Sequence, residues 1–183
     1  MENVKIDGIK DLDTVKELFS SVKCLKDDNC FLVVLNRDYV ASSVENNTFY
    51  KNNAVNVAVE GVIKEFNEKL NDKQKIVFSR NVYCGFLINV VNDGIGVIPL
   101  KNSGQLIPKI KDFKTDIDNY IFINNDEIEK IEIKKLPLRS KVKRLAVYFK
   151  DLDGANTPWT LPVKDKIVSY QEENYNKLVQ KLS

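Results

Sequence analysis

Residues 83–100 read YCGFLINVVNDGIGVIPL, and this stretch decides the fold. Two runs rich in β-branched and aromatic residues lie on either side of Asn92-Asp93-Gly94. Asp-Gly between two such runs is a strong signal for a β-hairpin, because glycine adopts the backbone conformation that a tight turn needs. The sequence therefore predicts an antiparallel strand pair at this point of the chain.

Further strand candidates extend from this hairpin in both directions along the chain. Short β-rich runs separated by turn residues occur at 30–35, 39–44, 76–80, 106–110, 120–124, 128–136, 144–149 and 157–163. Most of these strands follow one another without an intervening helix. That order argues against a Rossmann-like parallel sheet and favours an α+β or small barrel fold.

Three segments have the spacing of amphipathic helices. Apolar residues recur at intervals of three and four over 11–23, 53–70 and 165–182. Asp11 stands where the first of these helices needs an N-cap. At 183 residues the chain fits a single domain, 1–183, with a substantial core.

The order of strands and the closing helix resembles a known superfold. The residues that carry the resemblance are residues 83–100, then YIFINNDEIEKIEIKKLPLRSKVKRLAVYFKDLDG at 120–154, then LPVKDKIVSYQEENYNKLVQKL at 161–182. This pattern resembles the pleckstrin-homology-like (PH-like) domains, especially bacterial PH-like domain proteins of uncharacterised function. The resemblance implies a small antiparallel β-barrel or sandwich closed by the C-terminal helix, with an N-terminal helical extension at 1–27 and an inserted helix at 53–71.

The same resemblance carries expectations about the closing helix and the function. It implies that the final helix plugs an open corner of the barrel through Val168, Tyr175, Leu178 and Val179. It also implies a scaffold that binds proteins rather than an enzyme. Two features depart from the eukaryotic PH pattern: Trp159 precedes the last helix, and residues 36–38 hold a single basic side chain. The usual phosphoinositide site is therefore not supported.

Histidine is absent from the chain, which holds 28 Lys plus Arg and 26 Asp plus Glu for a net charge of +2. Without histidine there is no Ser-His-Asp or Cys-His nucleophile pair and no imidazole metal ligand. The charge is unevenly placed, because residues 1–72 carry a net −4 and residues 73–183 a net +6. Any anionic partner is therefore expected to meet the second part of the chain.

The cysteine pattern and the longest uncharged run indicate the compartment. Cys24, Cys30 and Cys84 form no C-x-x-C pair, so we expect reduced thiols and no metal or other cofactor. Residues 81–92 are the longest run without a charge, 12 residues, whereas a membrane-spanning helix needs about 20. The N-terminal residues are acidic and lack the apolar core of a signal peptide. These observations predict a cytoplasmic protein.

The sequence offers two groups of candidate contact residues. Six basic residues lie within an eleven-residue stretch and are candidates for contact with anionic lipid, a nucleic-acid backbone or an acidic protein surface: Lys134, Lys135, Arg139, Lys141, Lys143 and Arg144. The alternative is a solvated hairpin balanced by Asp126, Glu127, Glu129 and Glu132. Trp159 is a candidate partner anchor or a packing residue, and Tyr170 is expected to be exposed while Tyr175 is expected to be buried.

These patterns lead to a main functional hypothesis and two alternatives. The main one is a non-enzymatic cytosolic module that recognises a protein or peptide, or a second copy of itself, through a sheet edge or a groove beside the terminal helix. The first alternative is peripheral binding to an anionic membrane through 134–144. The second is an enzyme that works without histidine. Nucleic acid is not favoured as a partner, because no aromatic side chain interleaves the basic cluster.

Overall fold

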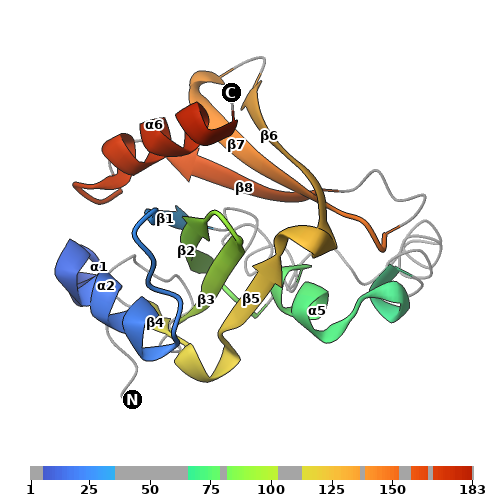
Figure 1. Ribbon diagram of the computed structural model, residues 1–183, viewed down its shortest axis with the longest axis horizontal. Helices are drawn as coiled ribbons and strands as arrows, with labels where there is room; N and C mark the ends of the chain where they lie inside the picture. The colour runs from blue at the N-terminus through green and yellow to red at the C-terminus, as the bar shows by residue number, and fades with distance from the viewer. Residues whose placement is uncertain are drawn as a thin grey trace, which may run out of the picture.

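The computed structural model describes residues 6–35, 66–78, 82–102, 113–136, 139–152, 158–164 and 167–182 (Figure 1). Within these ranges the elements in chain order are α1 (Ile6–Ile9), α2 (Leu12–Ser21), β1 (Cys30–Leu35), α5 (Asp72–Phe78), β2 (Gly85–Val91), β3 (Gly94–Asn102), β4 (Phe113–Thr115), η2 (Ile117–Asn119), β5 (Ile121–Asn124), η3 (Asn125–Glu127), β6 (Ile128–Leu136), β7 (Arg139–Phe149), β8 (Trp159–Lys164) and α6 (Gln171–Leu182).

The first sheet, which we call sheet A, is built around the hairpin of residues 83–100. Its strand order is β1-β2-β3-β4, and β5 also pairs with β3, all antiparallel. The predicted turn is confirmed, because β2 and β3 meet at Val91 and Gly94. A Cβ atom at Gly94 would collide with the carbonyl oxygen of Ile123. Glycine is therefore needed here so that β5 can pair closely with β3.

The second sheet, sheet B, has the order β6-β7-β8, also antiparallel. Figure 1 shows sheet B and α6 forming an upper layer over sheet A. The core between the two sheets joins Ile88 and Val97 of sheet A to Leu145 and Val147 of sheet B. The prediction of an α+β fold with antiparallel sheets and a C-terminal helix is confirmed. The described strands form two separate sheets that do not close into a barrel.

The opposite face of sheet A is covered by α1 and α2. Phe19 of α2 and Phe31 of β1 are both buried, with ring centroids 5.6 Å apart. The chain after α2 lies so close to β3 that a Cβ atom at Gly96 would come within 2.6 Å of Cys24 Sγ. Glycine at this position therefore permits the tight packing of the α2 layer on the sheet.

The outcomes for the predicted helices differ. The first helix is confirmed at Leu12–Ser21, and the Asp11 side chain accepts a hydrogen bond from Thr14 N as an N-cap. The last helix begins at Gln171 rather than 165, because residues 169–170 form a turn. Of the predicted helix at 53–70, residues 66–69 are helical and residues 53–65 lie outside the described residues. The predicted strands at 39–44 and 106–110 also lie outside them.

The predicted strand at 76–80 is wrong, since Asp72–Phe78 forms the helix α5. A capping box begins this helix: Asn71 Oδ1 accepts from Gln74 N at 2.9 Å, and Gln74 Oε1 accepts from Asn71 N at 3.0 Å. Both Gln74 and Val77 are buried, three residues apart on one helix face. A short apolar run does not by itself distinguish a strand from a helix. Here the capping box of Asn71 and Gln74 favours the helix.

Candidate functional site

Helix α6 covers the outer edge of strand β1 with side-chain amides. Gln171 Oε1 accepts a hydrogen bond from Val33 N at 3.0 Å, and Gln171 Nε2 donates to Val33 O at 3.1 Å. Asn174 Nδ2 donates to Phe31 O at 3.1 Å. The two amides therefore take the place of a neighbouring strand. Because these backbone groups are buried and paired, β1 is not an open edge for a partner.

The other end of α6 is fixed by Lys181. Its ammonium donates to Asp28 O at 2.7 Å, to Asp28 Oδ2 at 3.2 Å and to Asn92 Oδ1 at 3.2 Å. Burial alone would raise the pKa of Asp28, but hydrogen bonds from the Asn92 N–H and from Lys181 lower it below its ordinary value. The helix is thus held at both ends against sheet A, which makes it a fixed wall beside sheet B.

Strand β6 is the open edge of sheet B among the described strands. It pairs with β7 over Ile128–Leu136, and β8 at the opposite end of the sheet lies beside β1. An unpaired strand edge presents a row of N–H and C=O groups that can pair with another chain. At nine residues, β6 is long enough to receive a complete added strand.

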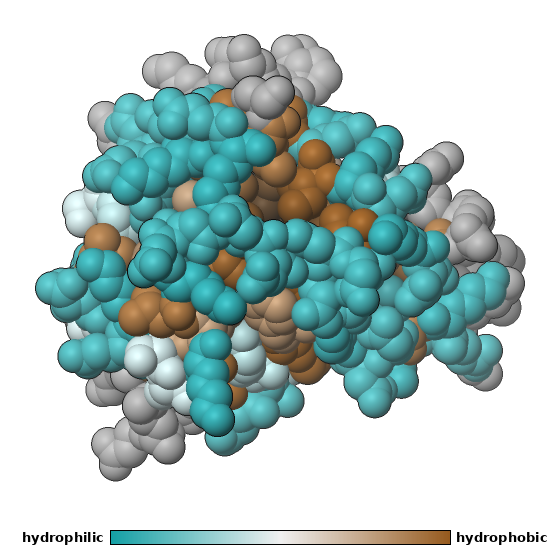
Figure 2. Space-filling model, in the orientation of Figure 1, coloured by the Kyte–Doolittle hydropathy of each residue, from teal (hydrophilic) through white to brown (hydrophobic). Residues whose placement is uncertain are grey.

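A hydrophobic recess lies between β6 and α6. Figure 2 shows hydrophobic side chains reaching the surface between these two elements. The half-buried hydrophobic residues that they contribute to the edge of the core are Ile131 and Ile133 of β6 and Val179 of α6. The register places Ile131 opposite Val147 and Ile133 opposite Leu145, so both isoleucines lie on the face of the sheet that lines the core.

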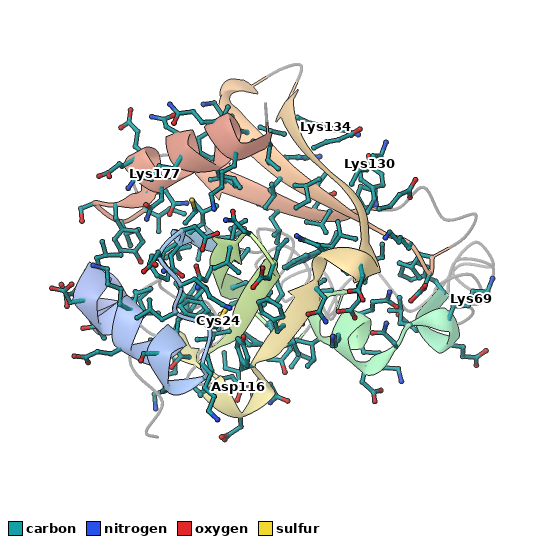
Figure 3. All side chains as sticks on the ribbon, viewed as in Figure 1. Cys24, Lys69, Asp116, Lys130, Lys134 and Lys177 are labelled. Carbon is teal, nitrogen blue, oxygen red and sulfur yellow. The ribbon has the colours of Figure 1, made fainter. Side chains whose placement is uncertain are left out.

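The other face of β6 carries a row of alternating charges. Lys130 Nζ lies 3.0 Å from one Glu132 carboxylate oxygen, and Lys134 Nζ lies 2.9 Å from the other. Hydrogen bonds from Lys134 and then from Lys130 lower the pKa of Glu132 to about 2. The Tyr148 ring lies between the lysines, with its centroid 4.5 Å from Lys130 Nζ and 5.2 Å from Lys134 Nζ. Figure 3 shows both lysines on the side of β6 away from α6.

The six predicted basic residues do not form one surface. Lys134 and Arg144 are paired across β6 and β7 and are both exposed. Lys143 belongs to the opposite face, where its ammonium lies 4.3 Å from the centroid of the Tyr175 ring of α6. Lys135, Arg139 and Lys141 lie on β6 and β7, and their side chains are outside the described part of the structure. Strand alternation therefore divides the cluster between two faces.

The acidic residues proposed to balance this cluster also divide. Glu132 pairs with Lys134, as the solvated-hairpin interpretation expects. Glu127 instead pairs with Lys73 of α5 at 2.7 Å. The balance of charge on the hairpin therefore depends on Glu132 more than on the acidic residues of η3.

The two aromatic candidates for partner contact are buried, so they are not exposed anchors. Trp159 is 3% exposed and packs edge-on against Phe86 at 5.5 Å. The prediction that Tyr170 is exposed is wrong: it is 6% exposed, and its hydroxyl donates to Ile9 O at 2.7 Å. Contact with α1, which the helical spacing did not reveal, buries Tyr170. The predicted burial of Tyr175 is confirmed.

The remaining residues of the expected plug divide between two cores. Leu178 joins Tyr175 in the core between the sheets, and Val179 lies half-buried at its margin. Val168 instead joins the core on the α1 and α2 side of sheet A. The chain around α6 therefore contacts both layers.

The thiols, and the acidic groups that the structure describes, give no sign of a metal or nucleophile site. Cys24, Cys30 and Cys84 are free and buried, and burial raises the pKa of the Cys84 thiol to about 12. In the ranges that the structure describes, no three Cys, Asp or Glu side chains gather as metal ligands. Across the same ranges, no helix has the length and apolar character needed to cross a bilayer.

A separate hollow of about 340 Å³ lies at the start of α6. Its lining residues are Lys10, Ile167, Val168, Ser169 and Glu172. These described lining residues supply one amine, one hydroxyl and one carboxylate, and among them there is no second carboxylate to complete an acid–base pair. The geometry therefore gives no reason to place chemistry in this hollow.

The sequence did not predict that the side-chain amides of Gln171 and Asn174 cover the edge of β1. It also did not predict that the side chain of Lys143 faces helix α6. Gln171 and Asn174 interrupt an apolar helix face that also includes Tyr175 and Leu178, and this interruption was the available signal. The alternation that places Leu145 inside also places Lys143 on the same face. Comparisons of the chain with protein-family models, with curated proteins and with solved structures found no match.

Proposed function

We propose that this protein is a non-enzymatic cytosolic binding module that receives an extended peptide segment of another protein along strand β6. The observation that carries the proposal is an edge strand, β6, that no other described strand pairs with on its outer side, beside a hydrophobic recess at whose margin Ile131, Ile133 and Val179 lie half-buried. The segment would add a strand to sheet B. Main-chain hydrogen bonds supply affinity in this mode, and pockets for alternate side chains supply selection.

The spacing of the recess fits strand addition. Side chains on one face of a strand recur every second residue, and so do Ile131 and Ile133. A segment added beside β6 would place its own alternate side chains next to these isoleucines and opposite Val179. Burying two apolar side chains of a partner there would contribute about 1.5–3 kcal/mol each before the costs of association.

Two features of the fold favour β6 over the other edges. The β1 edge is already occupied by Gln171 and Asn174, and β8 lies beside β1. Strands β4 and β5 pair with β3 alone among the described strands, but they are three and four residues long, against nine for β6. Fixing α6 through Lys181 also means that the wall of the recess is formed before a partner arrives. A preformed site lowers the ordering cost of binding.

We also retain the PH-like relationship as a proposal. Two stacked antiparallel sheets with a helix at the opening between them are compatible with it. Under that proposal α6 is the capping helix, and the recess lies between this helix and the sheet that it caps.

A titration monitored by NMR tests the proposed function. The full chain, labelled with ¹⁵N, is titrated with the peptide acetyl-SSVTVSS-amide. We expect saturable shifts concentrated in 128–134 and 175–182, and their loss when Ile131 and Ile133 are both replaced by Ala. The matched control is Val82→Ala, because Val82 is 51% exposed and belongs to neither β6 nor α6.

Two results would overturn this proposal. The first is an absence of shifts in β6 up to millimolar peptide while circular dichroism shows a folded chain. The second is a dimer in light scattering that the Ile131→Ala/Ile133→Ala chain loses, which would assign the edge to a second copy. A peptide carrying N-methyl groups on alternate residues should bind at least tenfold more weakly, since it cannot complete the ladder.

The membrane alternative has less support from the geometry. Lys143 faces Tyr175, and Lys134 shares Glu132 with Lys130, so the basic hairpin presents fewer unpaired charges than its sequence suggests. Flotation with vesicles of anionic phospholipid at low salt tests this alternative. Protein that stays with the soluble fraction would exclude it.

A further inference from the structure

The charges on the outer face of β6, opposite to the face that lines the recess, specify what kind of segment fits along this strand. On the outer face of β6 the order is Lys130, Glu132, Lys134, with two ammonium groups sharing one carboxylate. This row therefore has an excess of one positive charge. Arg144 lies across from Lys134 on β7, is exposed, and adds a second.

The hairpin formed by β6 and β7 also has a net positive charge in sequence. Residues 128–149 include seven basic side chains and two acidic ones, Glu129 and Glu132, for a net charge of +5. A second copy of the chain would bring its own exposed Lys130, Lys134 and Arg144 to the same edge, and this repulsion opposes self-pairing. An acidic partner would gain from the same field. The charge balance therefore selects an acidic segment over a second copy.

We propose that the segment received by β6 is acidic and follows the pattern acidic–apolar–any–apolar–acidic, in which the acidic residues lie beside Lys130 and Lys134. This inference rests on the function proposed above. Lys130 and Lys134 are four residues apart on one face, with Ile131 and Ile133 between them on the other. The pattern reads the same in both directions, so it holds for parallel and antiparallel addition.

Tyr148 prepares the two lysines for this role. The Lys134 ammonium donates to the Tyr148 hydroxyl at 2.6 Å, and that hydroxyl donates to Glu132 at 3.2 Å. Lys130 lies over the same ring. The side chains are thus held along the edge while remaining half-exposed, where an incoming carboxylate can reach them. The central position of the pattern meets Glu132, so an acidic residue is disfavoured there.

Three peptides that differ only in charge test the inference. Acetyl-SDVTVDS-amide, acetyl-SSVTVSS-amide and acetyl-SKVTVKS-amide are each titrated into the ¹⁵N-labelled full chain at 50 and 300 mM salt. We expect the acidic peptide to bind about tenfold more tightly than the lysine peptide, with the neutral peptide between them. The difference should shrink at the higher salt concentration, because these charges face solvent.

Charge reversal supplies the matched comparison. In Lys130→Glu/Lys134→Glu the preference should invert, so that the lysine peptide binds more tightly. Lys16→Glu/Lys114→Glu makes the same change in net charge on α2 and β4, two exposed positions outside the hairpin, and should keep the original order. If the reversed chain loses its native circular dichroism, Lys130→Met/Lys134→Met is used, and the three peptides should then bind within about twofold of one another.

The outcomes separate the two proposals. Equal binding of all three peptides to the wild-type chain would overturn the acidic pattern and leave strand addition intact. Inversion of the preference by the α2 and β4 control would also overturn it, because net charge would then explain the effect. Binding of none of the peptides would overturn strand addition itself, and the acidic pattern with it.

Discussion

Replacing Gln171 by Leu should destabilise the protein strongly although it places an apolar residue in a buried position. The change leaves Val33 N–H and Val33 C=O without their partners. Each buried backbone group left unpaired costs about 1–3 kcal/mol, or about 2–6 kcal/mol for the pair. Burial of the new leucine recovers about 1–2 kcal/mol. The difference between this cost and this recovery is about 0–5 kcal/mol. We therefore expect the free energy of unfolding to fall by about 2–3 kcal/mol, the middle of that range.

Urea and thermal denaturation of the full chain measure this loss. For a chain of this length, a fall of 2–3 kcal/mol corresponds to a decrease in Tm of about 4–12 °C. Gln180→Leu is the matched control, because it makes the same chemical change on the same helix at an exposed position. The loss of unfolding free energy in Asn174→Leu should lie between the losses in these two variants, since Asn174 contributes one hydrogen bond to β1.

One result would refute the reasoning about the covered edge. If Gln171→Leu and Gln180→Leu unfold within about 0.5 kcal/mol of each other, the amide of Gln171 does not seal β1. The assignment of β6 as the open edge would then lose one of its supports. A Gln171→Glu chain sharpens the comparison, because it keeps the acceptor for Val33 N and loses the donor to Val33 O.

Two further predictions concern the packing on the other face of sheet A and the thiols. Gly96→Ala should lower the free energy of unfolding by about 1–3 kcal/mol, because its Cβ would meet Cys24 Sγ at 2.6 Å. Adding Cys24→Ala should recover part of that loss in a double-mutant cycle, and strict additivity would count against the clash. Iodoacetamide at pH 8 should modify Cys84 roughly a thousandfold more slowly in the native chain than in urea, since burial raises the pKa of its thiol to about 12 and so lowers its thiolate fraction. Mass spectrometry of timed samples measures this rate, and rapid labelling of native Cys84 would contradict its burial.

The sequence predicted the strands well where local chemistry decides the structure. Asn92-Asp93-Gly94 formed the expected turn, and the alternation around Ile131 and Leu145 formed the expected strands. It was less informative at Asp72–Phe78, where a capping box outweighed an apolar run. Caps act through specific hydrogen bonds, which an apolar pattern does not record.

The candidate site depends on contacts between residues far apart in the chain, and these were harder to predict. Nothing local to Gln171 shows that its partner is Val33, or that Tyr170 lies under α1. From the sequence we expected a binding surface at a sheet edge beside the terminal helix, which is the kind of surface proposed here. The sequence did not show which strand would form that edge, because this depends on which strand helix α6 covers.

The pairing of Gln171 with β1 also has a consequence for folding during translation. Val33 and Gln171 are separated by 138 positions. At a translation rate of about 5–20 residues per second, β1 waits roughly 7–30 seconds for the helix that covers it. During that interval its backbone is open to pairing with other nascent chains. A ribosome-associated chaperone that shields extended segments would therefore matter most for this protein before α6 emerges.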